Sequence, residues 1–393
     1  MSTHPVIRVK PREGRRARAG APWLFSNEID MDAAAKSLAP GAVVNVVGDD
    51  GRSFGTGFFN PRSLIAVRLL DAEADAAINA AYFVGRLQRA LKLRERLFTA
   101  PCYRLVNAEG DGLPGLVIDR FGRACVVQIT TAGMEAAREA LIEAIETVLK
   151  PADIVLRADT PARALEGLDS YVTAARGSAG RLVVEENGVR YFADLAAGQK
   201  TGWYYDQREN RAFMASLARG HSVLDAFCFS GGFALAAARA GAAEAAGLDG
   251  SAAALALAEE AAAANGLSAK FIKCDVFTEL ERLAAADEQF DIVIADPPPF
   301  VKARKDLETG AKAYRKLARL AASVAAPSGI VFLASCSHNI PAERFALECA
   351  TGIARAGRSA RLIRQSGAGP DHPIHPMLPE SAYLKALVYA LDA

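Results

Sequence analysis

The sequence of 393 residues lacks the features that mark membrane, secreted and zinc-binding proteins. It has no run of 18 uninterrupted apolar residues, so no membrane-spanning helix is expected. The basic N-terminus is not followed by an apolar core and a cleavage site, so no secretory signal is expected either. The histidines number five, and no two of the six cysteines have C-x-x-C spacing. We therefore predict no metal site, reduced thiols and a cytoplasmic protein.

An excess of charge of one sign is also missing, because 46 Lys and Arg residues face 45 Asp and Glu residues and the net charge is +1. This balance does not exclude a nucleic-acid partner, since such a protein needs only one basic face. The hydrophobic fraction of 51% is ample for a buried core, and the length predicts two or three domains.

Short apolar runs between residues 223 and 337 end repeatedly in acidic, Gly, Pro or Cys residues. Alanine-rich segments with helical character separate most of these runs. This alternation predicts an α/β domain with a parallel sheet and crossover helices. In such sheets the ligand lies outside the carboxyl ends of the strands, which is where the unusual residues of this stretch fall.

The first turn of this stretch suggests a cofactor site. Gly231 and Gly232 follow a strand and open a helix over 233–240, but their spacing is not G-x-G-x-x-G, which argues against a nicotinamide dinucleotide. Asp249 ends the next strand, where an acid would bind ribose hydroxyls, and Asp275 ends the third. Together with Asp225 this set is similar to the S-adenosylmethionine site of class I methyltransferases. The alternative is a doubly wound domain with solvated acids.

A later strand ends at Asp296 and runs directly into Pro297, Pro298, Pro299 and Phe300. Prolines make this exit stiff and extended, so it can hold a carboxylate towards a planar base. The motif resembles that of amino-group methyltransferases, although Pro299 separates Asp-Pro-Pro from the aromatic residue. A simple strand-terminating turn is the alternative.

Cys336 lies between two serines at another expected strand end. Carbon 5 of cytosine is a poor nucleophile, but attack of a thiolate at carbon 6 turns the ring into an enamine-like species that accepts a methyl group. A single cysteine is more often an inert buried residue. The neighbouring methyl-donor site and Asp296 favour a nucleophile here.

These motifs together resemble the class I large-subunit ribosomal RNA methyltransferases that form 5-methylcytosine and carry an N-terminal PUA domain. The resemblance covers essentially the whole chain and includes the segments 198–211, 227–233, 296–298, 335–337 and 379–385. Pro299 is a departure, because family members have a basic residue there. The resemblance implies S-adenosyl-L-methionine as cofactor, large-subunit ribosomal RNA as partner, Cys336 as nucleophile and Asp296 as the residue that holds the base. The implied cofactor contacts are Gln207 and Arg208 near the methionine end, Asp225, Phe227, Gly231, Gly232, Asp249, Gly250, Ser251, Asp275, Val276 and Asp296.

The chain is expected to have three domains: a PUA-like β-barrel (1–75), a small α+β domain (76–188) and a Rossmann-like methyltransferase domain (189–393). Arginines next to an aromatic residue suit phosphate contacts and stacking on unpaired bases, and basic residues after Asp296 lie where an RNA backbone would pass. A solvated arm and a solvated basic loop are the alternatives. The predicted RNA contacts are Arg15, Arg16, Arg18, Trp23, Lys302, Arg304, Lys305 and Arg315.

Several questions stay open from the sequence alone. A helix over 80–98 carries basic residues, including Arg94, that either line RNA or face solvent. Trp203, Tyr204 and Tyr205 either cover the methyl donor or pack in the core, and the β-barrel strands could pair in a homodimer. Two other functions compete with the cytosine-5 methyltransferase. One is an amino-group methyltransferase acting on an RNA purine, and the other is a non-catalytic RNA-binding ribosome assembly factor.

Overall fold

The computed structural model describes residues 3–178, 180–194 and 202–393. The chain divides into two compact units, each with its own core. Of the described residues, the first unit contains 3–178, 180 and 370–379, and the second contains 181–194, 202–369 and 380–393. None of the helices in the described ranges is both long and apolar enough to cross a membrane.

The first unit begins with a five-stranded sheet in the order β1-β3-β4-β5-β2. Alternating apolar residues turn one side of its strands towards a small core that includes Leu24, Val44, Val46 and Val67. The expected small β domain is thus present, with two short helices added. The elements are β1 (Val6–Arg8), α1 (Arg15–Arg18), β2 (Trp23–Phe25), α2 (Ala33–Ser37), β3 (Ala42–Val47), β4 (Ser53–Phe59) and β5 (Ile65–Asp71).

A second five-stranded sheet follows in the order β10-β9-β8-β7-β6, with α3 and α5 packed against each other and sharing its core. After β8 the chain forms two helices in place of one continuous helix, because the helix breaks at Ala137. The elements are α3 (Ala80–Leu97), β6 (Cys102–Asn107), β7 (Leu116–Phe121), β8 (Ala124–Ile129), α4 (Ala132–Ala136), α5 (Arg138–Leu149), β9 (Asp153–Ala158) and β10 (Tyr171–Arg176).

Arg94 corrects the expectation that the basic residues of α3 face solvent or RNA. Its side chain is fully buried and forms a two-pronged ion pair with Asp111 (2.6 and 2.7 Å). It also donates to the backbone oxygens of Arg104 (2.9 Å) and Asp371 (3.0 Å). Asp111 lies in the short turn after β6, so the acids of that turn are structural. The segment 370–379 joins the first unit through these contacts.

The second unit is built on a seven-stranded sheet in the order β15-β14-β13-β16-β17-β19-β18. The five strands from β15 to β17 are parallel, as the sequence predicted, and β19 adds antiparallel to β17. The strands are β13 (Ser222–Ala226), β14 (Glu244–Asp249), β15 (Lys270–Lys273), β16 (Phe290–Ala295), β17 (Ala325–Ser335), β18 (Ala360–Ser366) and β19 (Lys385–Leu391).

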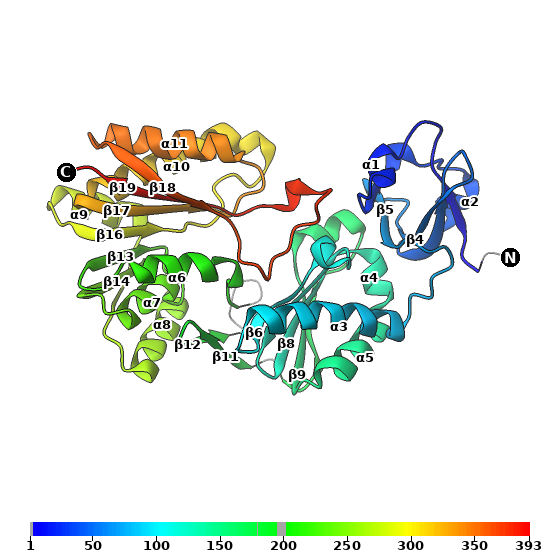
Figure 1. The fold of residues 1–393 in the computed structure, drawn as a ribbon, viewed down its shortest axis with the longest axis horizontal. Helices are drawn as coiled ribbons and strands as arrows, with labels where there is room; N and C mark the ends of the chain where they lie inside the picture. The colour runs from blue at the N-terminus through cyan, green and yellow to red at the C-terminus, as the bar shows by residue number, and fades with distance from the viewer. Residues whose placement is uncertain (1–2, 179, 195–201) are drawn as a thin grey trace. The chain divides into compact units, whose positions relative to one another are not determined.

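Helices cover both faces of this sheet (Figure 1). Along β16, Val293 and Ala295 pack under α9, α10 and α11, while Ile292 and Ile294 face α6 and α7. This alternation is the period of a strand buried on both sides. The helices are α6 (Arg208–Ser216), α7 (Gly232–Arg239), α8 (Ala252–Asn265), α9 (Val276–Ala285), α10 (Leu307–Ser323) and α11 (Ala342–Arg355).

A hairpin of β11 (Arg181–Glu186) and β12 (Val189–Asp194) precedes the sheet and packs on α8. The domain boundary expected at residue 188 falls in the turn of this hairpin, whereas the second unit starts at Arg181. The order of the sheet reverses at β13, which has β14 on one side and β16 on the other. In such sheets the ligand usually binds in the crevice at the carboxyl ends of the two strands where the order reverses. Here these strands are β13 and β16.

Candidate active site

The turn after β13 has an unusual backbone. Phe227, Phe229 and Gly231 all have left-handed φ angles of 64°, 49° and 79°. Phenylalanine rarely adopts this conformation, and such residues are concentrated at functional sites. The turn is held against β14, because the Cys228 N–H donates to the Leu248 oxygen (3.0 Å) and the Phe229 N–H donates to Asp249 Oδ2 (2.9 Å).

Glycines give this turn the space that it needs. A Cβ atom on Gly231 would lie 3.0 Å from both Ala258 Cβ and Phe271 Cζ, besides the strain of its left-handed φ. A Cβ atom on Gly247 would lie 2.7 Å from Phe271 Cδ1 and 2.8 Å from Cys228 Sγ. Gly231 therefore packs tightly against Phe271 of the sheet, and Gly247, to which the sequence analysis gave no role, takes part in the same packing.

Three of the predicted acids lie close enough for their charges to interact. Asp225 is fully buried, and burial raises its pKa to about 8, with the charges of Asp296 and Asp249 adding to the effect. The Ala234 N–H donates to Asp225 Oδ2 (2.9 Å). Within the described residues Asp225 Oδ1 has no hydrogen-bond partner, and neither has the buried hydroxyl of Ser230. Unsatisfied buried polar atoms of this kind suit a bound ligand.

The loops after β14 and β15 differ from each other. Asp249 accepts from the backbone of the first turn and, through Oδ1, from the Ser251 N–H (2.8 Å), and Gly250 lies between the two. Asp275 is exposed and caps α9, where the Thr278 N–H (2.9 Å) and hydroxyl (2.8 Å) hold its pKa below the usual range. Val276 is buried as the first residue of α9. The structure thus brings Asp249 to Asp225 and Asp296, and Asp275 stays at the rim.

Gln207 and Arg208 are buried where α6 begins. Gln207 Oε1 accepts from the Asn210 side chain (2.6 Å), and the Arg208 guanidinium lies over the Tyr205 ring, 5.3 Å from its centroid. The part of the quoted motif at 198–201 lies outside the described residues. The proposed contact of Gln207 and Arg208 with the methionine end of the cofactor stays a prediction.

The three aromatic residues before α6 divide into two roles. Trp203 and Tyr205 are buried, and Trp203 packs on Tyr191 and donates to Glu186 (3.2 Å). Tyr204 instead lies among the site residues. Burial raises its pKa, and the charges of Asp206, Asp296, Cys336 and Asp249 raise it further. Sequence reasoning left this choice open, and the structure places Tyr204 beside both the acids and the cysteine.

Cys336 is half-buried just after β17, and its two serine neighbours fix the surrounding loops. The Ser335 hydroxyl donates to the Tyr314 hydroxyl (2.8 Å), which in turn accepts from the Phe300 N–H (3.3 Å). The Ser337 hydroxyl donates to the Val301 oxygen (2.5 Å). The segment 335–337 is therefore tied on both sides of Cys336 to the loop that follows Asp296.

Lys385 is a residue of this site to which the sequence analysis gave no role. It is the partner of Ser335 across the β17–β19 pair, and its Nζ donates to the Ser337 oxygen (2.5 Å). Burial lowers the pKa of Lys385, and the charge of Cys336 opposes this change. The Lys385 side chain therefore lies close enough to the cysteine for their charges to interact. The motif 379–385 contained the signal, since a lysine that starts a buried strand needs a partner.

The predicted RNA contacts belong to different parts of the chain. In the first unit Arg15 is exposed, Arg16 donates to the Met377 oxygen (3.1 Å) and Arg18 pairs with Asp49 and Asp50. Trp23 donates to Glu109 (2.9 Å) and lies under the Arg68 guanidinium. In the second unit the predicted contacts Lys302, Arg304 and Lys305 are exposed in and near the loop after Asp296. The other predicted contact, Arg315, pairs with Glu348 at 2.5 Å.

Comparison with known proteins identifies the class. The family described as "S-adenosylmethionine-dependent methyltransferase" matches residues 175–390, and the family described as "PUA-like domain" matches residues 7–72. The chain belongs to the S-adenosylmethionine-dependent methyltransferases, and S-adenosylmethionine is its cofactor. This confirms the predicted fold class and cofactor. The described residues contain no group of three or more His, Cys, Asp and Glu side chains that could hold a metal ion.

Relatives cover almost the full length of the chain. It is 36% identical over 390 residues to Ribosomal RNA large subunit methyltransferase I of Shewanella denitrificans, covering 97% of this chain and 98% of that protein. It is 34% identical over 374 residues to the protein of the same name from Pseudoalteromonas atlantica, covering 93% and 94%.

Among solved structures, a methyltransferase complexed with SAH aligns with a TM-score of 0.83 at 21% identity, covering 98% of this chain and 100% of that chain. An S-adenosylmethionine-dependent methyltransferase from Streptococcus mutans aligns with a TM-score of 0.81 at the same identity and coverage. These similarities show the shared fold.

Proposed function

We propose that this protein transfers a methyl group from S-adenosylmethionine to carbon 5 of a cytosine in large-subunit ribosomal RNA, with Cys336 as a covalent nucleophile. The substrate class rests on the relatives described above, which are named for ribosomal RNA of the large subunit. The chemistry rests on one observation: Cys336 is held between two serines that are both linked to the loop after Asp296. The Ser335 hydroxyl is linked to this loop through Tyr314, and the Ser337 hydroxyl donates to it directly.

The residues of the turn after β13 fit the cofactor. The unsatisfied Asp225 Oδ1 and Ser230 hydroxyl give two oxygen atoms that can form hydrogen bonds with its polar groups. Asp249 and the backbone of the turn form the adjoining wall. When bound, S-adenosylmethionine supplies the electrophilic methyl group.

The protein residues prepare the base. In our proposal Cys336 Sγ adds to carbon 6 of cytosine, and the electron pair of the 5,6 double bond makes carbon 5 nucleophilic. After methylation a base accepts the carbon 5 proton, the electron pair of that C–H bond restores the 5,6 double bond, and Sγ leaves carbon 6 as a thiolate. Asp296, a backbone oxygen and water are the candidate acceptors of the proton. Asp296 holds the base from the opposite loop, and Lys385 acts as a positioning residue that favours the thiolate over the thiol.

This assignment is tested with Cys336→Ala and, as the matched control, Cys274→Ala, which removes another half-buried thiol that directly follows β15 of the same sheet. Ribosomal RNA is incubated with each purified protein and isotopically labelled S-adenosylmethionine, and the labelled nucleoside is identified by mass spectrometry. We expect 5-methylcytosine from the wild type and from Cys274→Ala.

For Cys336→Ala we expect turnover to fall roughly a thousandfold or more, because a nucleophile contributes on this scale, with SAH affinity retained. RNA that contains 5-fluorocytidine should form a stable adduct with the wild type and with Cys274→Ala but not with Cys336→Ala, since fluorine cannot leave as a proton does. Retained turnover in Cys336→Ala would sink the covalent mechanism. A labelled N-methyl purine would move the chemistry to Asp296-Pro-Pro, and absence of both label and SAH binding would indicate a non-catalytic assembly factor.

A further inference from the structure

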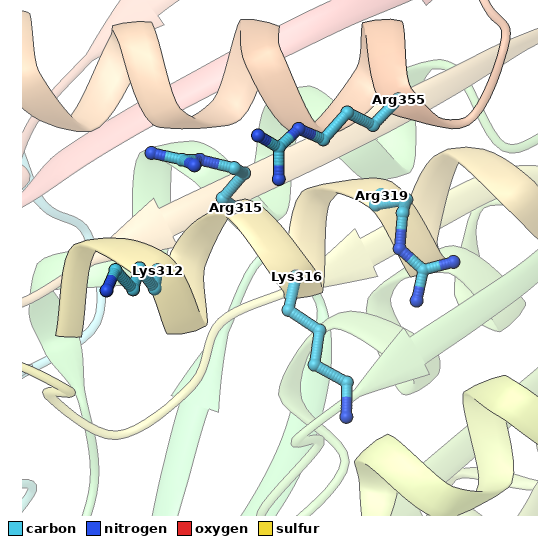
Figure 2. A pocket seen from close by; sticks show the side chains of 5 residues that line it. All are labelled: Lys312, Arg315, Lys316, Arg319 and Arg355. Carbon is cyan, nitrogen blue, oxygen red and sulfur yellow. The ribbon is translucent and has the colours of Figure 1, made fainter. Parts of the chain in front are cut away.

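The outer surface of α10 and α11 contains a cleft of about 330 Å³ that is lined by cationic side chains alone. Figure 2 shows Arg355 reaching from α11 towards Arg315, while Lys316 and Arg319 project from α10 in the direction away from α11. This cationic groove is defined by Lys312, Arg315, Lys316, Arg319 and Arg355.

The spacing along α10 concentrates this charge. Positions 312, 315, 316 and 319 follow the i, i+3, i+4, i+7 pattern, so one helix face carries all four cations over about 10 Å of axis. A Cβ atom on Gly352 of α11 would lie 2.4 Å from the Arg315 oxygen, so the two helices are in close contact. That contact brings Arg355 to the cations of α10.

Much of this charge is not neutralised by the protein. Arg315 pairs with Glu348 (2.5 Å) and Lys316 pairs with Glu281 (2.9 Å). The other three cations, Lys312, Arg319 and Arg355, form no ion pair with a carboxylate in the described ranges 3–178, 180–194 and 202–393. Like charges gathered in one cleft repel each other, and a bound polyanion removes that repulsion.

Hydrogen bonds and ring contacts connect the helix of the cationic groove to the candidate active site. Tyr314, on the buried side of the same helix turn, bonds to both the Phe300 N–H and the Ser335 hydroxyl. Lys316 Nζ lies over the Phe277 ring, 5.2 Å from its centroid, and that ring also contacts Phe227 and Phe300. The helix that carries the cations is thus fixed against the cofactor turn and the loop after Asp296.

We propose that the cationic groove binds the phosphate backbone of the RNA substrate next to the methylated nucleotide. This inference rests on the proposed function and adds a binding surface to it. A protein partner fits less well, because such interfaces centre on apolar and aromatic anchors and the lining of this cleft offers none. Phosphate contacts of this kind position the RNA and do not read its sequence.

The test compares two triple variants with equal charge change. The groove variant is Lys312→Gln/Arg319→Gln/Arg355→Gln. The control is Arg219→Gln/Arg239→Gln/Lys270→Gln, three exposed cations next to the amino ends of β13, β14 and β15, opposite the edge that holds the site. Affinity for a fluorescent single-stranded fragment of large-subunit ribosomal RNA is measured at several salt concentrations, and SAH affinity checks that each variant is folded.

For single strands the plot of log K against log salt falls with a slope of about −0.7 for each phosphate contact. The groove variant removes three cations, so the steepness of this plot should decrease by about 2. Its KM for RNA should rise, with kcat and SAH affinity unchanged, while the control keeps the wild-type slope. A wild-type slope in the groove variant, or an equal decrease in the control, would overturn the inference. Failure of the wild type to methylate ribosomal RNA would instead refute the proposed function, so the two failures are distinguishable.

Discussion

The second unit of an Asp225→Asn variant should be more stable than that of the wild type, by an amount that grows as the pH rises. Burial raises the pKa of this carboxyl to about 8, against 3.8 for an ordinary Asp. Between these two pH values the folded state holds a proton that the unfolded chain has lost, so the free energy of unfolding falls as the pH rises. Asn at this position has the same shape, can still accept from the Ala234 N–H, and does not titrate.

The magnitude follows from the size of the shift. One pKa unit corresponds to about 1.4 kcal/mol, so at pH 7 the ionisation of Asp225 that accompanies unfolding lowers the free energy of unfolding of the wild type by about 4 kcal/mol. At pH 5 the same calculation gives about 2 kcal/mol. The stability advantage of Asp225→Asn should therefore grow by about 3 kcal/mol between pH 5 and pH 7. The carboxylate is retained in spite of this cost because, as we propose, its unsatisfied Oδ1 receives the cofactor.

The two tryptophans of the chain allow a clean assay, because Trp23 is in the first unit and Trp203 is in the second. In a Trp23→Phe background, urea unfolding followed by the emission of the buried Trp203 reports on the second unit alone. Asp275→Asn is the control, since hydrogen bonds lower the pKa of that exposed carboxyl and its effect lies below this pH range. Asp225→Asn should also weaken SAH binding. Parallel stability curves for wild type and Asp225→Asn from pH 5 to pH 7 would refute the reasoning.

Two further predictions concern Lys385 and Arg94. Lys385→Met should raise the pKa of the Cys336 thiol, because a nearby cation favours the thiolate, and should move the acidic limb of the kcat/KM profile up by about one pH unit. The control Lys385→Arg should keep the wild-type profile. If the acidic limb does not move in Lys385→Met, Lys385 has no role in the mechanism. Arg94→Met should destabilise the first unit by about 3–5 kcal/mol in urea unfolding, because the Asp111 carboxylate loses its buried partner. Arg94→Met/Asp111→Asn should recover part of this loss, and equal stability of the single and double variants would contradict an origin in the unpaired charge.

Local patterns were sufficient for most of the elements. Apolar runs that end in Asp, Gly or Pro predicted the parallel strands β13 to β17, because a strand buried on both faces needs a continuous apolar run and a polar exit. The antiparallel insertion of β19 between β17 and β18 was not predictable in this way. It depends on which sheet edge the tail can reach, and no local pattern records that.

The burial of Arg94 could have been predicted from the helical spacing of the buried residues of α3. The buried residues Phe83, Leu87 and Ala90 recur at helical spacing, and Arg94 continues the same stripe. Its position therefore indicated burial, although its charge suggested the opposite. Only the tertiary structure supplies the reason, because the carboxylate of Asp111 and two backbone oxygens come from other segments.

The sequence by itself determined the chemical groups available to this protein: a glycine turn, acids at successive strand ends, Asp296 before prolines, and Cys336 between serines. Residue types and short spacings were enough for this, since each strand end is a local feature. The tertiary structure decided which of these groups meet. It brought Asp225, Asp249 and Asp296 within reach of one another, left Asp275 at the rim, placed Tyr204 and Lys385 beside Cys336, and assembled the cationic groove from two helices. Such convergence depends on strand order and helix packing, which are properties of contacts between segments far apart in the chain.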